Sequence, residues 1–111
     1  MGRRILVVDD EPQIRRILRA VLVAKGYDVM EAECGEYALN LLRFEEYDLL
    51  LLDINVPGIT GVEVCREVRK SSNIPIIMMS AGEENRVRAL EAGANDYLTK
   101  LFGVSQIFLC V

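Results

Sequence analysis

Short apolar segments recur along the chain at lengths that suit strands of a buried sheet. Residues 5–8 form a β-branched run bounded by charged residues, and residues 49–52 are four leucines that lead directly into Asp53. Continuous apolar runs of this length are typical of strands that are covered on both faces. We predict strands over residues 5–8, 27–32, 49–52, 74–79 and 97–99.

Between these runs, apolar residues repeat with the spacing of one face of a helix. Glycines stand where two of these stretches stop, at Gly26 and Gly93, and Gly61 precedes a third. The four predicted stripes are Ile14, Ile17, Leu18, Val21 and Leu22; then Tyr37, Ala38, Leu41 and Leu42; then Val62, Cys65 and Val68; and finally Val87 and Leu90.

The resulting order is strand–helix repeated four times and closed by a fifth strand. Such alternation implies a parallel sheet with helices on both faces, and right-handed crossovers make it doubly wound. A length of 111 residues suits one domain. We therefore predict a single α/β domain.

The amino-acid composition excludes several classes of catalytic and binding site, although it says little more about the fold. The chain has no histidine, which removes Ser-His triads, histidine–zinc sites and histidine bases. The net charge of −4 gives no basic face for nucleic acid, so we expect no nucleic-acid binding by this chain. Three separated cysteines without a C-x-x-C pair favour reduced thiols, and the first apolar run is too short for a leader or a membrane span. We expect a cytoplasmic protein without a membrane segment.

Polar residues follow the predicted strands where ligands bind in parallel sheets. Asp9 and Asp10 leave the first strand, Asp53 the third, Ser80 the fourth and Lys100 the fifth. Carboxyl ends of parallel strands share one edge, and neighbouring strands lie about 4.8 Å apart. Three carboxylates that close repel one another, so either one is partly protonated or a cation binds, and Mg²⁺, which takes hard oxygen ligands, is the natural cation. A carboxylate beside Mg²⁺ can attack a phosphoryl group, with Lys100 and Ser80 contacting its oxygens.

Each residue also has a purely structural explanation. Asp10 and Gln13 resemble a capping box before a helix with Pro12 in its first turn. Asp53 could be a turn residue, and Ser80 and Lys100 could be solvated polar residues. Tyr97 by itself reads as a half-buried strand aromatic. Four strands of one predicted sheet each end in a residue that suits a phosphate or a metal, and this joint occurrence favours the functional interpretation.

The same residues resemble the receiver domain of bacterial two-component response regulators. The matching segments are "ILVVDDE", "LLLLDINVPGITG", "IIMMSA" and "ALEAGANDYLTK", in order and spacing, over about residues 3 to 102. The stretch "RVRALEAGANDY" is similar to receivers attached to winged-helix transcription factors, and we expect no output domain within these 111 residues. The resemblance implies a flavodoxin-like sheet in the order 2-1-3-4-5 and assigns residues 1–111 to a receiver domain.

The resemblance also implies a role for each site residue. Asp53 accepts a phosphoryl group from the phosphohistidine of a sensor kinase or phosphotransfer protein. Asp10 binds Mg²⁺ directly, Asp9 through water, and Asn55 through its backbone carbonyl. Ser80 takes the switch hydroxyl position beside the small Ala81, Tyr97 the switch aromatic position, and Lys100 the position of the phosphoryl-contacting lysine. Phosphorylation would draw Ser80 and Lys100 to Asp53 and turn Tyr97 inward.

Three features depart from the family pattern near the C-terminal end. The family usually has Lys-Pro-Phe with a cis bond, whereas this chain has Lys100-Leu101-Phe102, for which we expect a trans bond because cis would cost about 3 kcal/mol. The segment from Ser80 to the fourth helix is about two residues short, which predicts a tight loop or a late helix start. Residues 101–111 form an atypical apolar tail in place of a full fifth helix, so we expect a homodimer or a swapped tail.

Three other functions fit parts of the pattern. A degenerate receiver would keep the fold and bind partners without productive switching. A Mg²⁺-dependent aspartyl phosphatase usually carries D-x-D after the first strand, whereas here the candidate nucleophile leaves the third strand. A flavodoxin would need a Ser/Thr-rich phosphate loop after Val8, which is missing. We expect a phospho-acceptor rather than an enzyme that turns over.

Overall fold

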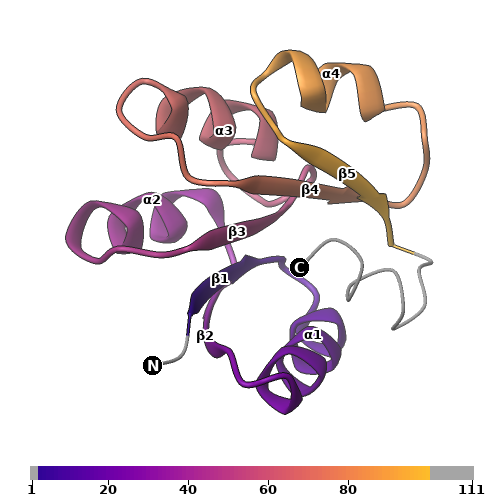
Figure 1. The fold of residues 1–111 in the computed structure, drawn as a ribbon. Coiled ribbons are helices and arrows are strands. Elements are labelled where there is room, and N and C mark those ends of the chain that lie inside the picture. The colour runs from indigo at the N-terminus through magenta and orange to yellow at the C-terminus, as the bar shows by residue number, and fades with distance from the viewer. Residues whose placement is uncertain (1–2, 101–111) are drawn as a thin grey trace.

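The computed structural model describes residues 3–100, and within that range the chain forms five strands and four helices. Figure 1 shows the strands as a twisted central layer with helices on either side. In chain order the elements are β1 (Arg4–Val8), α1 (Pro12–Ala24), β2 (Asp28–Ala32), α2 (Gly35–Phe44), β3 (Leu49–Asp53), α3 (Gly61–Arg69), β4 (Ile76–Ser80), α4 (Arg86–Glu91) and β5 (Asp96–Thr99).

The sheet has the order β2-β1-β3-β4-β5, and every neighbouring pair is parallel. This confirms the predicted flavodoxin-like arrangement. In the register, Val8 pairs with Leu52, Asp53 with Met79, and Ser80 with Thr99. The strands therefore end at nearly the same level, and the residues that leave them are brought to one edge.

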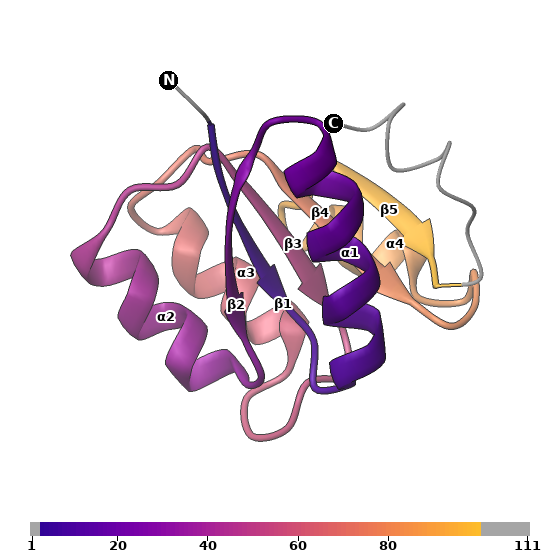
Figure 2. The same ribbon diagram turned by 90° about the horizontal axis from the view of Figure 1, so that it is seen from below.

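Alternate residues of each strand enter two separate cores. Leu50 and Leu52 of β3 face the side covered by α2, α3 and α4, whereas Leu49 and Leu51 face α1. Figure 1 shows α1 on the opposite side of the sheet from these three helices, and Figure 2 shows it lying across the near face. Full burial of a leucine side chain contributes about 2 kcal/mol, so the four leucines anchor β3 from both faces.

Helix boundaries follow local chemistry. Pro12 opens α1, where its missing N–H costs no hydrogen bond. Gly26 follows α1 with a φ of 95°, a conformation that glycine adopts without strain. Thr60 and Glu63 form a reciprocal capping box at the start of α3, with each side chain accepting from the other's backbone N–H.

The expectation that Asp10 caps α1 is wrong. The residue before the helix is Glu11, and no side chain makes a cap hydrogen bond there. A cap from Asp10 would have to accept the N–H of residue 12 or 13, and Pro12 has none. The helix instead begins after Glu11, whose own backbone N–H is bonded to the Asp9 carboxylate. The acidic segment is therefore shaped by Asp9 rather than by a cap from Asp10.

Helix α4 is short and begins late, in line with the shortened segment after Ser80. It contains six residues and is followed by Gly93, whose φ is 116°. Val87 and Leu90 lie on its exposed side. The predictions for the Lys100–Leu101 bond and for the tail concern residues 101–111, which lie outside the described range. No helix within residues 3–100 has the length and apolar character needed to cross a bilayer.

Candidate functional site

Asp9 and Asp53 lie side by side at the carboxyl edge of the sheet, at the ends of the adjacent strands β1 and β3. Their side chains are almost fully buried, with 0% and 1% exposure, whereas Asp10 is exposed. One ligand oxygen from each of Asp9, Asp10 and Asp53 lies within 4.8 Å of the others. The predicted convergence of these three acids is therefore observed.

The pose of Asp53 is fixed from both sides. Its Oδ1 accepts a hydrogen bond from the backbone N–H of Asn55 at 3.1 Å. On its backbone side the start of α3 approaches so closely that a Cβ on Gly61 would lie 2.4 Å from the Asp53 carbonyl oxygen. A glycine is needed there because any side chain would push α3 away from the end of β3.

Asp9 is held by two backbone groups and by the side chain of Arg15. Its Oδ1 accepts from the Glu11 backbone N–H at 2.9 Å, and its own N–H donates to the carbonyl oxygen of Ala32 at 3.1 Å. The Arg15 guanidinium donates to the Asp9 carbonyl oxygen at 2.6 Å while pairing with Glu31 at 3.0 Å. The loop between β1 and α1 is thus held to the end of β2 through Ala32 and to α1 through Arg15.

Lys100 reaches back over this edge into the group of acids. Its Nζ lies 2.7 Å from Glu11 Oε1, 2.9 Å from Asp53 Oδ2 and 3.2 Å from Asp9 Oδ2. Its backbone N–H donates to the carbonyl oxygen of Ser80 at 2.6 Å, which fixes the start of the side chain. The altered Lys-Leu-Phe sequence therefore leaves the ammonium beside Asp53.

Burial and charge act on the protonation of these groups in opposite ways. Burial raises the pKa of the Asp9 carboxyl, and the nearby charge of Asp53 raises it further, while the Glu11 N–H and Lys100 oppose the rise without cancelling it. Burial alone would lower the pKa of the Lys100 ammonium. Its hydrogen bonds to Glu11 and Asp53 outweigh that effect, so the pKa of Lys100 is raised and the side chain stays charged.

Ser80 and Tyr97 lie on the neighbouring strands and are both buried. The Ser80 hydroxyl, on a residue 2% exposed, accepts a hydrogen bond from Asn85 Nδ2 at 3.3 Å. The Tyr97 hydroxyl donates to the carbonyl oxygen of Gly82, and its ring is 1% exposed. The expectation of a half-buried Tyr97 is wrong: the short loop after Ser80 closes over the ring, which already points inward.

The donor set suits a magnesium ion by its chemistry. All three clustered ligands are carboxylate oxygens, the type that Mg²⁺ prefers. Asp9 Oδ2 is buried and accepts no hydrogen bond, although the Lys100 ammonium lies 3.2 Å away as an ion-pair partner. This oxygen is therefore available as a ligand for a cation. The structure places the Asn55 N–H beside Asp53, and the role of the Asn55 carbonyl stays a prediction.

The sequence interpretation missed three contributors to this region. Glu11 contacts Lys100, Arg15 holds the Asp9 backbone, and Asn85 contacts the Ser80 hydroxyl. Glu11 could have been found from its place directly after the acidic pair. Arg15 lies on a helix by pattern and Asn85 in the loop before α4, and only the folded chain shows what each side chain contacts.

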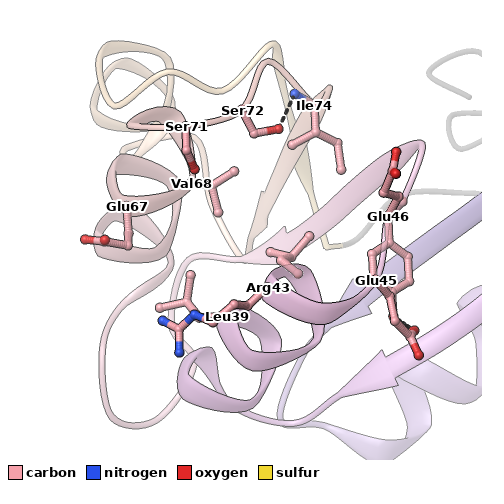
Figure 3. Close-up of a pocket in the computed structure, with 11 residues that line it drawn as sticks. Leu39, Arg43, Glu45, Glu46, Glu67, Val68, Ser71, Ser72 and Ile74 are labelled. Atoms are coloured by element: carbon pink, nitrogen blue, oxygen red, sulfur yellow. Dashed lines mark hydrogen bonds between the residues drawn. The ribbon is translucent and has the colours of Figure 1, made fainter.

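A separate pocket lies at the opposite edge of the sheet (Figure 3). It has a volume of about 320 Å³ and is formed by the second half of α2, the segment between α2 and β3, the end of α3 and the segment that follows α3. Leu39, Val68 and Ile74 contribute apolar surface, and Glu45 and Glu46 lie on its rim. None of the predicted site residues lines it.

Comparison with known proteins identifies relatives along nearly the whole chain. The family profile described as the response regulator receiver domain matches residues 5–111. The transcriptional regulatory protein ResD of Bacillus subtilis is 48% identical over 110 residues, which are 97% of this chain and 46% of that protein. The chain thus spans about half the length of this curated relative.

Solved structures agree with the sequence comparison. The chemotaxis response regulator CheY4 of Vibrio cholerae matches with a TM-score of 0.94 and 28% identity, covering 99% of this chain and 96% of that one. The receiver domain of the sensor histidine kinase PA1611 from Pseudomonas aeruginosa matches with a TM-score of 0.91 and 31% identity, covering 99% and 94%. The latter structure has a magnesium ion coordinated in its active-site cleft.

Proposed function

The chain belongs to the response regulator receiver domain family, and on that premise we propose that it is a signalling switch that accepts a phosphoryl group on Asp53. The donor would be the phosphohistidine of a sensor kinase or phosphotransfer protein. Because the chain itself has no histidine, a phosphohistidine must come from a partner. The output of the whole protein would be transcriptional, by analogy with ResD, and this chain would not itself bind nucleic acid.

The observation that carries the proposal is the placement of Asp53. Its carboxylate is held at the rim of a buried strand, with Lys100 at 2.9 Å and Asp9 beside it. A buried carboxylate with a fixed cationic partner is prepared for attack on an electrophile, because neither group has to reorganise. A turn residue with a merely structural role would not need this lysine.

In the proposed phosphoryl transfer each residue of the site has a separate role. An Asp53 carboxylate oxygen attacks phosphorus, the P–N bond to the donor imidazole breaks, and the imidazole leaves with the bonding electrons. Lys100 and the Ser80 hydroxyl then donate to phosphoryl oxygens. Asp9, Asp10, Asp53 and the Asn55 carbonyl would hold Mg²⁺, which would neutralise charge on the transferring group. Protein groups supply position and charge, and no acid–base side chain is required.

The loop before α4, which contacts both Ser80 and Tyr97, would transmit the effect of phosphorylation from the site to the surface formed by α4 and β5. Tyr97 points inward and is tied to Gly82, and Ser80 is tied to Asn85, so both contacts belong to the loop before α4. Phosphorylation replaces one negative charge by about two and draws the Ser80 hydroxyl toward Asp53. The loop and α4 would shift with it, and the α4–β5 face would change shape.

A mass measurement tests the proposal. The protein is incubated with Mg²⁺ and a small acyl phosphate, and its intact mass is recorded. We expect a gain of one phosphoryl group in the wild-type chain and no gain in Asp53→Asn. Asp28→Asn is the matched control: Asp28 is the first residue of β2, at the edge of the sheet opposite to Asp53, and this variant should still gain the group. Failure to gain mass would favour a degenerate receiver, and continuous hydrolysis of the donor would favour a phosphatase.

A further inference from the structure

Glu11 is the closest partner of Lys100 in the site. The Lys100 Nζ lies 2.7 Å from Glu11 Oε1, compared with 2.9 Å to Asp53 Oδ2 and 3.2 Å to Asp9 Oδ2. The three acceptors differ in exposure: the Asp9 and Asp53 side chains are buried, and the Glu11 side chain is 45% exposed. Lys100 is thus shared between two carboxylates inside the site and one at its rim.

This sharing matters because two cations would compete for the same oxygens. Asp9 and Asp53 are the buried members of the cluster that could hold a metal ion, and both are paired with Lys100. A divalent ion placed on them would repel an ammonium bound to the same carboxylates. Glu11 offers Lys100 an acceptor a short distance away, so the ammonium can stay paired while Asp9 and Asp53 turn to the metal.

The geometry does not suit a capping role for Glu11. No side chain caps α1, although Glu11 occupies the position before the helix. The Glu11 main chain is fixed by the bond from its N–H to Asp9 Oδ1. The main chain of Glu11 is thus fixed beside the site, and its carboxylate pairs with Lys100 at 2.7 Å instead of capping the helix.

Building on the proposed function, we propose that Glu11 is a positioning residue that holds the Lys100 ammonium at the rim while Asp9 and Asp53 bind Mg²⁺. Glu11 acts through Lys100 and contacts neither the metal nor the phosphoryl group. Its presence raises the Mg²⁺ affinity, because the ion does not have to displace an ammonium that has no other partner. Lys100 also remains within reach of Asp53 for the phosphoryl oxygen.

A double-mutant cycle on Mg²⁺ binding tests this role without phosphorylation. Mg²⁺ is titrated by calorimetry into the wild-type chain, Glu11→Gln, Lys100→Met and the double variant. We expect Glu11→Gln to weaken Mg²⁺ binding about tenfold in the wild-type background and less than about twofold when Lys100 is absent, since contacting residues couple and independent ones do not. Glu46→Gln, an exposed acid at the opposite edge, controls for the loss of one charge and should change the affinity less than about twofold.

A second measurement follows the Lys100 side chain itself. In a ¹⁵N-labelled sample the Lys100 ammonium signal should persist in the wild type when Mg²⁺ is saturating, and should be lost on Mg²⁺ binding in Glu11→Gln. This measurement does not depend on the stability of the Lys100→Met variant.

The outcomes separate the two proposals. An equal loss of affinity in both backgrounds of the cycle would show that Glu11 acts only through its charge, and would overturn its positioning role while the phospho-acceptor function stands. Unchanged Mg²⁺ affinity in Glu11→Gln would do the same. A wild-type chain that binds no Mg²⁺ would overturn the metal site of the proposed function and this inference together.

Discussion

Replacement of Lys100 by methionine removes the positive charge from the group of acids and keeps most of the side-chain volume. The change leaves Asp9 and Asp53, both buried, beside Asp10 and Glu11 with no ammonium among them. We expect the metal-free protein to lose stability at about pH 7.5, since removal of one partner of a buried ion pair exposes the others to uncompensated repulsion.

The magnitude follows from the distances. Unit charges 2.9 Å apart, as Lys100 Nζ and Asp53 Oδ2 are, attract by about 6 kcal/mol at an effective dielectric constant of about 20. Desolvation of the ammonium and the ordering of its side chain oppose this attraction. Loss of a buried partner typically costs about 3–5 kcal/mol, and the 15% exposure of Lys100 reduces it. We therefore expect a loss of about 2–3 kcal/mol.

The free energy of unfolding that is lost in Lys100→Met should be smaller at low pH than at neutral pH. Folding raises the pKa of Asp9 above its ordinary value of 3.8. At pH values between the ordinary pKa of the unfolded chain and the raised pKa of the folded chain, the folded state binds more protons, so its stability falls as the pH rises. Lys100 is one of the groups that lower the pKa of Asp9, and its removal raises that pKa further. Asp9 in the variant is then protonated to a higher pH, and the deficit should shrink at about pH 5.

Urea denaturation at the two pH values is the assay. With an m value of about 1–1.5 kcal/mol/M for a domain of this size, the midpoint should fall by about 2 M near pH 7.5 and by clearly less near pH 5. Lys70→Met is the matched control, because Lys70 forms an exposed pair with Glu67 and should matter by less than about 0.5 kcal/mol. A deficit of equal size at both pH values would refute the electrostatic explanation.

Two packing contacts give further predictions. Gly61→Ala places a Cβ 2.4 Å from the Asp53 carbonyl oxygen, so it should cost about 1–3 kcal/mol in urea unfolding and slow phosphorylation of Asp53; normal stability together with normal phosphorylation would contradict the close approach. Tyr97→Phe leaves the Gly82 carbonyl without its donor and should cost about 1 kcal/mol, whereas Tyr37→Phe, at an exposed ring, should cost less than about 0.5 kcal/mol.

Most of the fold could be predicted because its signals are local. The four leucines of β3 and the helical stripe of α1 require only that apolar residues be buried, and the strand–helix alternation then restricts the topology. The same logic placed Asp9, Asp53 and Lys100 at one edge, because each directly follows or ends a strand. Errors in strand boundaries were one or two residues and left the edge unchanged.

The rest could not be predicted because it depends on contacts between distant segments. Burial of Tyr97 results from the short loop that closes over it, with Gly82 as acceptor. The role of Asn85 depends on where that loop turns. Asp10 matched a capping pattern, but the helix begins one residue later than that pattern requires, and Glu11 occupies the position before it. The residue at which a helix starts and the contacts that a closing loop makes are properties of the folded chain, and they do not appear as a sequence pattern.

The site couples stability to ligand binding because its acids are costly when no cation is bound. Asp9 has a raised pKa and an oxygen without a hydrogen bond, so the metal-free fold carries an unfavourable charge that Lys100 offsets only in part. Any cation or phosphoryl group that redistributes this charge must also redistribute Lys100, which is anchored by its backbone to Ser80. Ser80 precedes the loop that covers Tyr97. A change of charge at Asp53 would therefore reach the α4 side through a short chain of direct contacts, and the burial of the acids would make that change energetically large.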